Sequence, residues 1–560
     1  MGVVLSALPR PAGPPPPTPL RHPLRLFACS ALCLCAVGRG ARADECAMVE
    51  SRASLGTLSG ARIASLEIVA EGPTLPGPTQ LAAGLHPVSR DATIRRQLLF
   101  APGDTVDTLL VGETMRRLRR QRLFSDAVLL ARRCEPSGMV GLVLRTRDSW
   151  TLRPTARLRS TNSLSVGVEE KNLFGTGRSV AVTSEMSKWG AGGGVTLVDP
   201  WLFGRDVEGS LRIAKLGGAR TLRLGLRNHE YSVFDRWRAE GSVSRLSFAD
   251  TGAPERSLHA LRAAMLVGRR VGASPAAVTM LLAGVEFDSA ATISPARATW
   301  TDTSRAPHVR SFLGADVGLL RRTAQYDTAS WVVPGRGFLD VPVGWEAEGV
   351  LGAGYQRGVR TPALKLDAWA GRVWVPARGR IVMVDGWASG YAGRGVDANH
   401  IARLSTAWYE EGWRGMWGAR FTAERLIELD PDLRALSLMP LADYTAPAVR
   451  PYSVRGGTSV AGSVDRAVHL FRAGAASVVD AGAFVAGSYR WRVAGVPGGQ
   501  LRAGVAGARL RLLTANGAVS SVRVDLGYPV LLSDVLARKP FVVLTMGTIF
   551  DVSRQRDGRR

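Results

Sequence analysis

One pattern, repeated from residue 149 to the end of the chain at residue 560, restricts the fold more than any other feature. Segments of about ten residues alternate apolar and polar side chains and are separated by Gly, Asn, Asp and Pro. In residues 521–528 (SVRVDLGY), one face carries Val, Val, Leu and Tyr, and the opposite face carries Arg, Asp and Gly. A wall with lipid outside and water inside requires this alternation. The pattern therefore predicts a mainly β fold, a transmembrane antiparallel β-barrel over residues 151–560.

The expected turns and ends of the strands agree with a barrel. Asn516 and Gly517 separate two alternating segments, as in a tight hairpin turn that needs positive backbone φ angles. We expect the first strand near residues 152–161 and the closing strand at residues 541–550, after which DVSRQRDGRR follows. With about 10 residues per strand, turns and longer outer loops, the region predicts about 16 strands.

Tryptophan is distributed unevenly along the chain. All 14 tryptophans lie at or after Trp150. Amphipathic indole rings concentrate where a barrel crosses the two membrane interfaces, so this distribution agrees with a barrel. The alternative is a set of core tryptophans in a soluble β-sandwich, but a sandwich of about 100 residues is much shorter than this region.

Residues 1–43 have the composition of an export signal peptide. A basic, proline-rich start leads to the apolar run LFACSALCLCAV and then to Ala41-Arg42-Ala43, an A-x-A cleavage site. An anchoring helix is one alternative, but a membrane-spanning helix needs about 20 apolar residues and this run is shorter. A lipoprotein signal at Cys29 is another alternative. We expect a mature protein that leaves the cytoplasm.

Charge and cysteine content narrow the possible partners. The formal net charge of +25 favours anionic lipid or nucleic acid. Because an export signal precedes the chain and no nucleic-acid-binding motif is visible, we expect contact with lipid and none with nucleic acid. Of the five cysteines, only Cys46 and Cys134 follow the signal. An oxidising compartment allows these two to form a disulfide, although spacing alone does not establish contact.

A linker at residues 44–62 precedes a mixed α/β pattern at residues 63–150. Residues 62–72, 126–133 and 139–146 alternate as strands do, whereas residues 92–100 and 106–124 show helical periodicity. The predicted order is strand, helix, helix, strand, strand. Five arginines from Arg116 to Arg122 form a basic run on the second helix. A solvated helix face is the simpler interpretation, and contact with lipid phosphates or an acidic partner is the alternative.

The order of module and barrel resembles the BamA/TamA-like outer-membrane assembly and translocation superfamily, which includes the two-partner secretion transporters. In that family, one or more periplasmic POTRA domains precede a 16-stranded barrel. Residues 63–150 are similar to one POTRA domain, with Gly103 and Asp104 between the helices and Phe124 before the second strand. VEEKNLFGTG (168–177) looks like the family's E-x-N-x-x-G-x-G hairpin and DPWLFG (199–204) like the next strand ending, while PGRGF (334–338) is a weaker match.

The segment Val454-Arg455-Gly456-Gly457 is similar to the family's VRG-aromatic motif, with Gly457 in the aromatic position. In the family, this motif lies on a loop that folds back into the barrel, where its arginine meets an aspartate on an inner strand. The resemblance implies that Arg455 is a lumen arginine and Asp480 its partner. A guanidinium in a narrow, partly dry lumen needs a carboxylate, which its planar fork holds bidentately. An unpartnered arginine in a surface loop is the alternative.

No catalytic or metal chemistry is visible in the sequence. The histidines lack the spacing of zinc ligands, and there is no Walker loop or nucleophile elbow. We therefore expect no catalytic residues, no metal, no cofactor and no enzymatic activity.

The resemblance implies a function and a location. It implies a protein of the outer membrane of a Gram-negative bacterium, with the α/β module in the periplasm, which inserts or translocates polypeptides without nucleotide hydrolysis. The implied partners are outer-membrane lipid, accessory assembly subunits, and an unfolded or extended client polypeptide that adds to the module's edge strand at residues 126–133. The alternative is a structural surface-antigen barrel, or a passive pore, with no dedicated client.

Overall fold

The computed structural model describes residues 47–49, 58–73, 86–121, 123–134, 139–159, 163–187, 190–216, 219–228, 235–250, 253–274, 277–293, 308–323, 325–329, 339–356, 361–393, 399–427, 457–472, 477–491, 499–515, 519–532 and 540–548. The predicted signal peptide, Cys46, Val454, Arg455 and Gly456 lie outside these residues.

The first described residues form an α/β module. Its elements are β1 (Ala47–Val49), β2 (Ile63–Glu71), α2 (Asp91–Arg95), α3 (Thr108–Arg120), β3 (Phe124–Cys134) and β4 (Met139–Asp148). The sheet has the order β1-β3-β4-β2, in which β2 and β4 are parallel and β3 and β4 are antiparallel. The predicted order of elements is confirmed, with β1 as an additional short strand. Neither of the two described α-helices has the length and apolar character that crossing a membrane would require.

One apolar core joins the helices of the module to its sheet. Ile94 of α2 and Leu118 of α3 are fully buried against Ile63, Phe124 and Leu144 of the strands. Burying each such side chain contributes about 1.5–3 kcal/mol to folding. Phe124, which the family resemblance places before the second strand, is therefore a core residue.

The predicted Gly103-Asp104 pair forms the turn that leads from α2 to α3. Gly103 has a φ of +97°, a conformation that glycine adopts without strain. The Asp104 carboxylate accepts a hydrogen bond from the Ala101 amide at 2.8 Å, and the Gly103 amide donates to the Ile63 carbonyl at 2.9 Å. The pair thus closes the turn and fixes it to β2.

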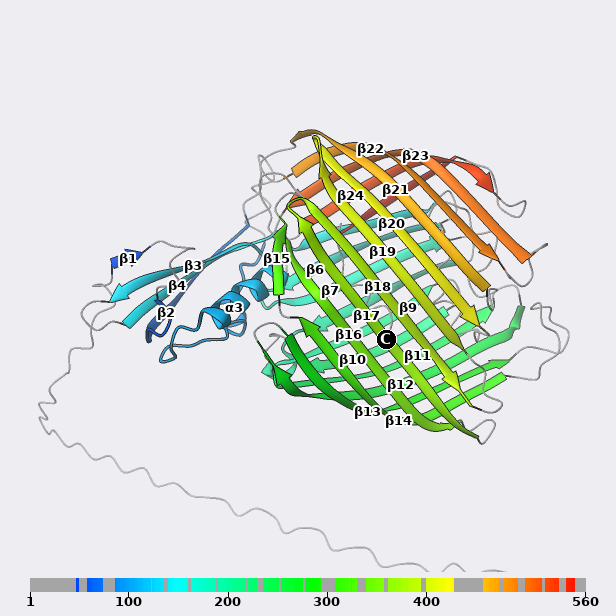
Figure 1. Cartoon of the computed structure of the whole chain (residues 1–560), viewed down its shortest axis with the longest axis horizontal. Coiled ribbons are helices and arrows are strands. Elements are labelled where there is room, and N and C mark those ends of the chain that lie inside the picture. Colours follow the sequence, from blue (N-terminus) through cyan, green and yellow to red (C-terminus); the bar gives the residue numbers. More distant parts are fainter. Residues whose placement is uncertain are drawn as a thin grey trace, which may run out of the picture. The chain divides into compact units, whose positions relative to one another are not determined.

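The rest of the described chain forms a closed antiparallel barrel of long, tilted strands (Figure 1). The strands are β5 (Leu152–Arg159), β6 (Ser163–Leu173), β7 (Arg178–Ser187), β8 (Gly190–Asp199), β9 (Val207–Leu216), β10 (Ala219–Asn228), β11 (Trp237–Asp250), β12 (Ala253–Ala273), β13 (Ala277–Ile293), β14 (His308–Thr323), β15 (Gln325–Ala329), β16 (Leu339–Gln356), β17 (Thr361–Ala377), β18 (Arg380–Ala392), β19 (His400–Gly412), β20 (Gly415–Ile427), β21 (Gly457–Arg472), β22 (Ser477–Trp491), β23 (Gln500–Ala515), β24 (Val519–Leu532) and β25 (Phe541–Thr548). A short 3₁₀ helix, η5 (Leu202–Gly204), precedes β9.

The barrel has 20 strand positions, so the prediction of 16 is wrong. Strands β5 to β25 number 21, but β14 and β15 pair with β16 in one continuous register and share a position. The prediction assumed long outer loops. Residues 160–162, 188–189, 217–218 and 251–252 instead connect successive strand pairs in two or three residues, which leaves more of the chain for strands.

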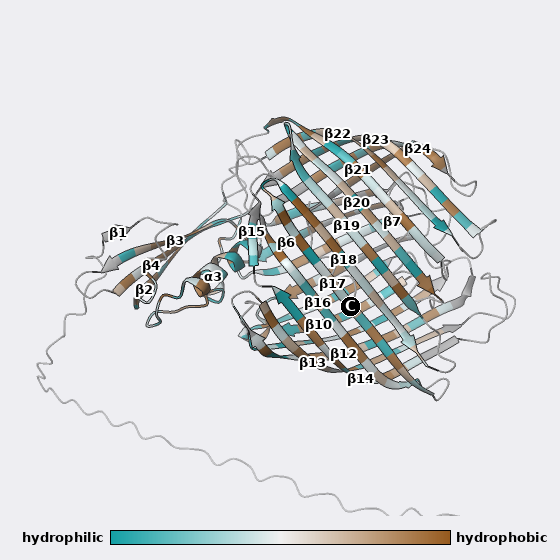
Figure 2. Ribbon diagram, viewed as in Figure 1, coloured by the Kyte–Doolittle hydropathy of each residue, from teal (hydrophilic) through white to brown (hydrophobic). Residues whose placement is uncertain are grey.

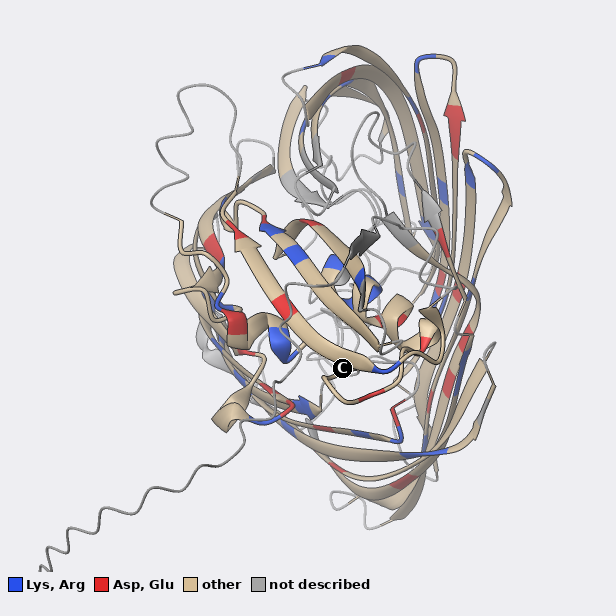
Figure 3. Cartoon of the chain, turned by 90° about the vertical axis from the view of Figure 1, so that its left-hand side faces the viewer, with Lys and Arg blue, Asp and Glu red and all other residues tan. Residues whose placement is uncertain are grey.

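Apolar and charged side chains occupy opposite faces of the wall, as predicted. On β23, Leu510 and Leu512 are exposed, whereas the alternating Arg509 and Arg511 side chains are only 9% and 7% exposed. Hydropathy alternates along the strands in Figure 2, and Figure 3 shows charged residues around the ring of strands. The outer face of the barrel is therefore apolar and its inner face is charged.

The two ends of the barrel are distinguished by the path of the chain. We name as proximal the end at which β5 begins, directly after β4, and as distal the opposite end. Because the strands are antiparallel and occupy an even number of positions, β25 runs toward the proximal end. The connection of residues 428–456 between β20 and β21 leaves and re-enters the wall at the distal end.

Candidate functional site at the barrel seam and the proximal turns

The barrel closes through a short ladder between its first and last strands. Among the described residues, β25 pairs with β5 at three positions: Val543 with Arg159, Leu544 with Leu158, and Thr545 with Arg157. The neighbouring ladders of β5 with β6 and of β24 with β25 each contain eight pairs. The contact between β5 and β25, called the seam below, is therefore weakly paired.

The proximal part of β5 has the character of an edge strand. Within the described chain, residues 152–156 pair with β6 but have no partner in β25. This stretch includes Pro154, which lacks a backbone N–H and is tolerated at edges. A peptide group without a hydrogen-bond partner costs several kcal/mol in hydrocarbon. The seam is thus where an added strand would be stabilised most.

The hairpin motif predicted at residues 168–177 forms the turn between β6 and β7, and its asparagine joins the module to the barrel. Asn172 is fully buried. Its Oδ1 accepts a hydrogen bond from the Gly177 amide at 2.9 Å, and its Nδ2 donates to the Ser89 hydroxyl at 2.9 Å. The same Nδ2 lies 3.5 Å from the Asp148 carboxylate. One side chain therefore fixes the turn and contacts two segments of the module.

Gly175 allows the module to approach this turn closely. Its φ is +73°, and an added Cβ would lie 2.3 Å from the Val88 carbonyl oxygen. The Gly175 carbonyl accepts hydrogen bonds from the Arg90 amide and the Thr93 hydroxyl, both at 2.9 Å. The start of α2 is therefore bound directly to the backbone of a barrel turn.

The second predicted motif, DPWLFG, forms the next proximal turn, between β8 and β9. Trp201 is buried and the Arg96 guanidinium lies 5.7 Å from its ring centroid. Asp199 accepts a hydrogen bond from Arg178 at 2.9 Å, which joins the two turns. Both motifs thus build the surface on which α2 rests.

A buried polar network continues from the turn to the start of β5. His86 Nε2 lies 2.6 Å from the Thr151 hydroxyl, and that hydroxyl donates a hydrogen bond to the Glu170 carboxylate. The same carboxylate also accepts a hydrogen bond from the backbone amide of Asn172 at 2.6 Å. Burial lowers the pKa of His86, and its ring packs against Trp150. The module is thereby linked to the first residues of the seam strand.

Asp148 lies at the centre of the junction. Its side chain is fully buried and accepts a hydrogen bond from the Ser89 amide at 2.7 Å. Burial raises the pKa of Asp148 to about 6, and the hydrogen bonds from Ser89 lower it in part. Sequence reasoning did not identify His86, Ser89 or Asp148, because the contacts between Ser89 and Asp148 or Asn172 span 59 and 83 residues.

The predicted edge strand of the module is partly covered by the chain itself. β1 pairs with β3 from Ala131 to Arg133, so the outer side of β3 is occupied at those three positions. Within the described residues, no strand lies against residues 126–130 on that side. The edge available to an extended partner is therefore shorter than predicted. Cys134 ends β3, whereas its predicted partner Cys46 lies outside the described residues.

The interpretation of the basic run on α3 as a solvated face is wrong for its first two arginines. Arg116 and Arg117 are buried. Arg116 forms an ion pair with Glu113, and its guanidinium lies 4.1 Å from the centroid of Tyr326 on β15. The helix turns Arg116 toward the proximal rim of the barrel, a contact that helical periodicity alone does not reveal.

The predicted lumen aspartate, Asp480, is fully buried on the inner face of β22. Its carboxylate lies 2.5 Å from His469 Nδ1 and 3.4 Å from the Arg511 guanidinium, residues that stand directly opposite it on β21 and β23. Asp480 thus belongs to an inner ion-pair ladder near the proximal end.

Gly457, the one residue of the loop motif that the structure describes, lies at the other end of the wall. Gly457 begins β21 with a φ of +122° and pairs with Leu426 at the distal end. The nearby inner acid of β20 is Glu424, which is held by Arg403 at 2.6 Å and Arg490 at 2.8 Å. Because Arg455 lies outside the described residues, its pairing with Asp480 stays a prediction.

The geometry defines a class of protein: a β-barrel with an apolar outer wall, a charged lumen, a weak seam and an α/β module bound to its proximal turns. No protein-family model and no curated protein matches the chain.

Solved structures match most of its length. The chain is similar to CdiB from Acinetobacter baumannii, at 10% identity and a TM-score of 0.38, over 87% of this chain and 74% of that one. It is similar to BamA from Haemophilus ducreyi lacking POTRA domains 1–3, at 10% identity and a TM-score of 0.36, over 87% and 85% of the two chains. It also matches the FrpB iron transporter from Neisseria meningitidis, at 9% identity and a TM-score of 0.36, over 75% and 87%. At these identities and TM-scores the matches carry no argument about this chain, and its barrel fold rests on the strand pairing described for β5 to β25.

Proposed function

We propose that this chain is an outer-membrane protein of the BamA/TamA-like superfamily, which inserts or translocates polypeptides at the seam between β5 and β25. The observation that carries the proposal is the seam itself, with three residue pairs against eight in each neighbouring ladder. The protein would act by strand pairing, without nucleotide hydrolysis, enzymatic activity or a cofactor.

The seam provides both a binding site and a driving force for an extended client. Within the described chain, the backbone groups of residues 152–156 on the side of β25 have no partner, so they can donate hydrogen bonds to an added strand and accept them from it without competing water. Each new pair satisfies groups that otherwise cost several kcal/mol. A client strand that pairs with β5 is therefore stabilised while β25 moves away.

In this proposal, the α/β module is a periplasmic POTRA-type domain that delivers the client. Its sheet offers the edge of β3 at residues 126–130, where an extended segment adds by backbone hydrogen bonds. The hydrogen bonds of Asn172 and Gly175 hold this module beside β5 and β6. Capture and insertion thus occur next to each other, with accessory subunits as further partners.

Locking the seam with a disulfide tests the proposal. Arg157 and Thr545 stand directly opposite each other in the seam, so the double variant Arg157→Cys/Thr545→Cys can be cross-linked by mild oxidation. The matched control is Ser163→Cys/Ser187→Cys, an opposed pair between β6 and β7. Both are made with Cys46 and Cys134 replaced by serine, so that no native thiol interferes.

The readout is the outer-membrane protein profile of cells depleted of the native chain and supplied with each variant. We expect the oxidised seam variant to lose specific barrels or exported chains and to recover on reduction, while the oxidised control remains active. A seam variant that stays active when cross-linked would refute strand exchange. An unchanged profile on depletion alone would favour the alternative, a structural surface-antigen barrel or passive pore.

A further inference from the structure

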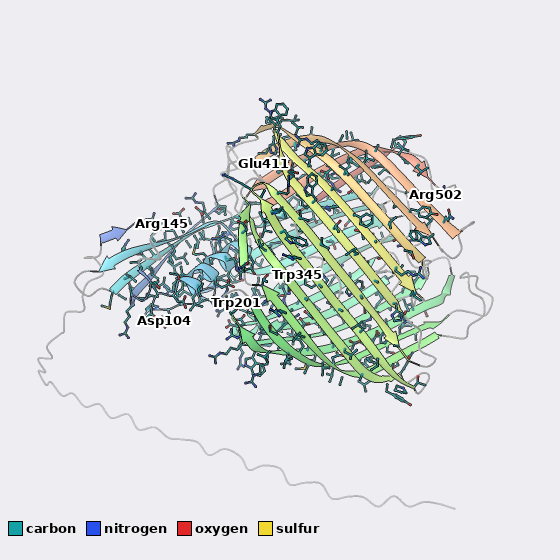
Figure 4. All side chains as sticks on the ribbon, in the orientation of Figure 1. Asp104, Arg145, Trp201, Trp345, Glu411 and Arg502 are labelled. Carbon is teal, nitrogen blue, oxygen red and sulfur yellow. The ribbon has the colours of Figure 1, made fainter. Side chains whose placement is uncertain are left out.

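The proximal end of the outer wall carries tryptophans and arginines. Trp345, labelled in Figure 4, lies on β16 and is 52% exposed, on the same outer face as the exposed Leu351 and Tyr355. Arg372 of β17 stands directly opposite Trp345, and Trp374 follows two residues later on the same face. A charged side chain therefore lies on the same outer face as the exposed Leu351 and Tyr355.

Arg372 lies between two indole rings. Its guanidinium carbon is 4.9 Å from the Trp345 centroid and 4.7 Å from the Trp374 centroid, both within the range of a cation–π interaction. Its remaining neighbours on the outer face are Ala370 on its own strand and Val384 opposite it on β18. None of these four neighbours supplies a negative charge.

One nitrogen of the guanidinium also lacks a protein acceptor within the described residues. Its Nε is buried and has no hydrogen-bond partner among the described residues. Two other arginines of the outer proximal wall do have partners. Arg380 forms an ion pair with Glu410 at 2.6 Å, and Arg466 donates to the Trp413 carbonyl at 2.5 Å. Arg380 and Arg466 each also keep one buried nitrogen without a partner, so Arg372 differs from them in having no ion pair or hydrogen bond to a protein acceptor within the described residues.

The surface on the distal side of Arg372 is lined by small side chains. Ala347 stands opposite Ala370, and Gly349 opposite Ala368, before the larger pair of Leu351 and Leu366. An added Cβ on Gly349 would meet nothing within 4 Å, so this part of the wall is open. The result is a shallow apolar strip that begins at the guanidinium and runs along the strands.

A second basic residue borders the strip. Arg321 of β14 is exposed and stands opposite Ala347, on the same outer face as Leu319 and Val317. The pairing register places it one strand beyond Trp345, on the side away from Arg372. The patch therefore combines positive charge with indole rings at the level where a bilayer places its phosphates.

We propose that this patch, formed by Arg372, Trp345 and Trp374, binds the phosphate of an anionic glycerophospholipid in the proximal leaflet. The fork of Arg372 donates to the phosphate oxygens, since charge-assisted bonds of this kind suit a planar guanidinium. An acyl chain lies over the strip of Ala347, Gly349, Ala368 and Ala370. The inference rests on the membrane location of the barrel proposed above.

The test uses the full mature chain, folded in phosphatidylcholine nanodiscs that contain a minor fraction of phosphatidylglycerol. After extraction into detergent, native mass spectrometry counts the phosphatidylglycerol molecules retained by each barrel. The variants are Arg372→Gln and Ala370→Leu, with Arg380→Gln as the matched control because Glu410 already pairs with that arginine. Ala370→Leu fills the strip without changing charge, on a face that already carries exposed leucines.

We expect the wild type and Arg380→Gln to retain the anionic lipid, and Arg372→Gln to retain it roughly 10- to 100-fold more weakly. Ala370→Leu should also weaken retention. Equal retention by wild type and Arg372→Gln would overturn the inference, and so would full displacement of the lipid by inorganic phosphate at the same concentration. The shift in gel mobility between unheated and heated samples reports barrel folding separately. If neither the wild type nor any variant folds in the bilayer, the proposed membrane location is wrong, and not only the lipid site.

Discussion

Replacing Gly175 by alanine tests whether the α/β module is held by the turn between β6 and β7. The φ of +73° at this position costs an L-residue about 1–2 kcal/mol. The new Cβ would also lie 2.3 Å from the Val88 carbonyl oxygen, a backbone atom that moves only if the segment before α2 moves. The module must therefore withdraw from the turn.

That withdrawal breaks two hydrogen bonds to the Gly175 carbonyl, from the Arg90 amide and the Thr93 hydroxyl at 2.9 Å. Each such bond contributes about 0.5–1.5 kcal/mol net. The loss of docking free energy is therefore about 1–3 kcal/mol beyond the backbone cost, or roughly a 5- to 150-fold shift toward an undocked module.

A matched control separates the clash from the backbone cost. Gly499 has a φ of +65°, and an added Cβ there would meet nothing within 4 Å. Gly499→Ala thus carries the conformational penalty without the contact. Hydrogen exchange of the amides at residues 86–95 measures docking, and heat-dependent gel mobility measures folding of the barrel.

We expect Gly175→Ala to accelerate exchange in residues 86–95 while the barrel remains folded. Gly499→Ala should leave that exchange unchanged. If the amides of residues 86–95 exchange at the same rate in the two variants, the hydrogen bonds to the Gly175 carbonyl do not hold the module, and the proposed role of this junction is wrong.

Three further predictions follow from the junction, the cysteines and the lumen. Burial raises the pKa of Asp148 from 3.8 to about 6, so ionisation of this carboxyl group opposes docking of the module. The contribution of Asp148 to the docking free energy is therefore most favourable below about pH 4, becomes less favourable as the pH rises to about 6, and does not change at higher pH. Burial lowers the pKa of His86, which gives docking the opposite dependence on pH. The difference in hydrogen exchange between wild type and Asp148→Asn therefore isolates the Asp148 contribution. A difference that does not change with pH would contradict this prediction. If the register of Ala47 opposite Arg133 continues by one residue, Cys46 faces Cys134, and non-reducing peptide mapping of the exported protein should yield one linked peptide rather than two free thiols. Arg455→Ala should abolish rescue of depleted cells if the loop arginine serves translocation, whereas full rescue would indicate a barrel that needs no lumen arginine.

The sequence predicted features that depend on neighbouring residues. Alternation identified β2, β3 and β4, and the family resemblance placed Gly103 and Asp104 between the helices, where the structure has a turn. Polarity alternation also predicted the two faces of the barrel, because every strand must satisfy the same solvent boundary. The number of strands was not predictable in this way, since it depends on connection lengths that no periodicity specifies.

Features formed by residues far apart in the sequence could not be predicted from it. The hairpin motif at residues 168–177 was recognised as a turn, but nothing local indicated that Asn172 bonds Ser89, 83 residues away. The same limit applies to Arg116, which a helical pattern places on a polar face. The residue that covers it, Tyr326, lies on a barrel strand more than 200 residues later. A helix face can be called solvated only when the whole fold is known.

The seam and the junction meet on the same strand, and this connects the two parts of the proposed function. Thr151, whose hydroxyl joins His86 of the module to Glu170 of β6, directly precedes Leu152, the first residue of β5. β5 has eight residues, fewer than the roughly 9–11 that a tilted strand needs to cross a bilayer, while β12 has 21. In the proposed membrane location, a short wall would bring the two membrane surfaces closer together beside the seam and lower the cost of introducing a polar backbone there. In the proposed function, a captured polypeptide that displaced the module would act first on the seam, because the module is fixed to the start of this short strand and the seam has the least pairing to break.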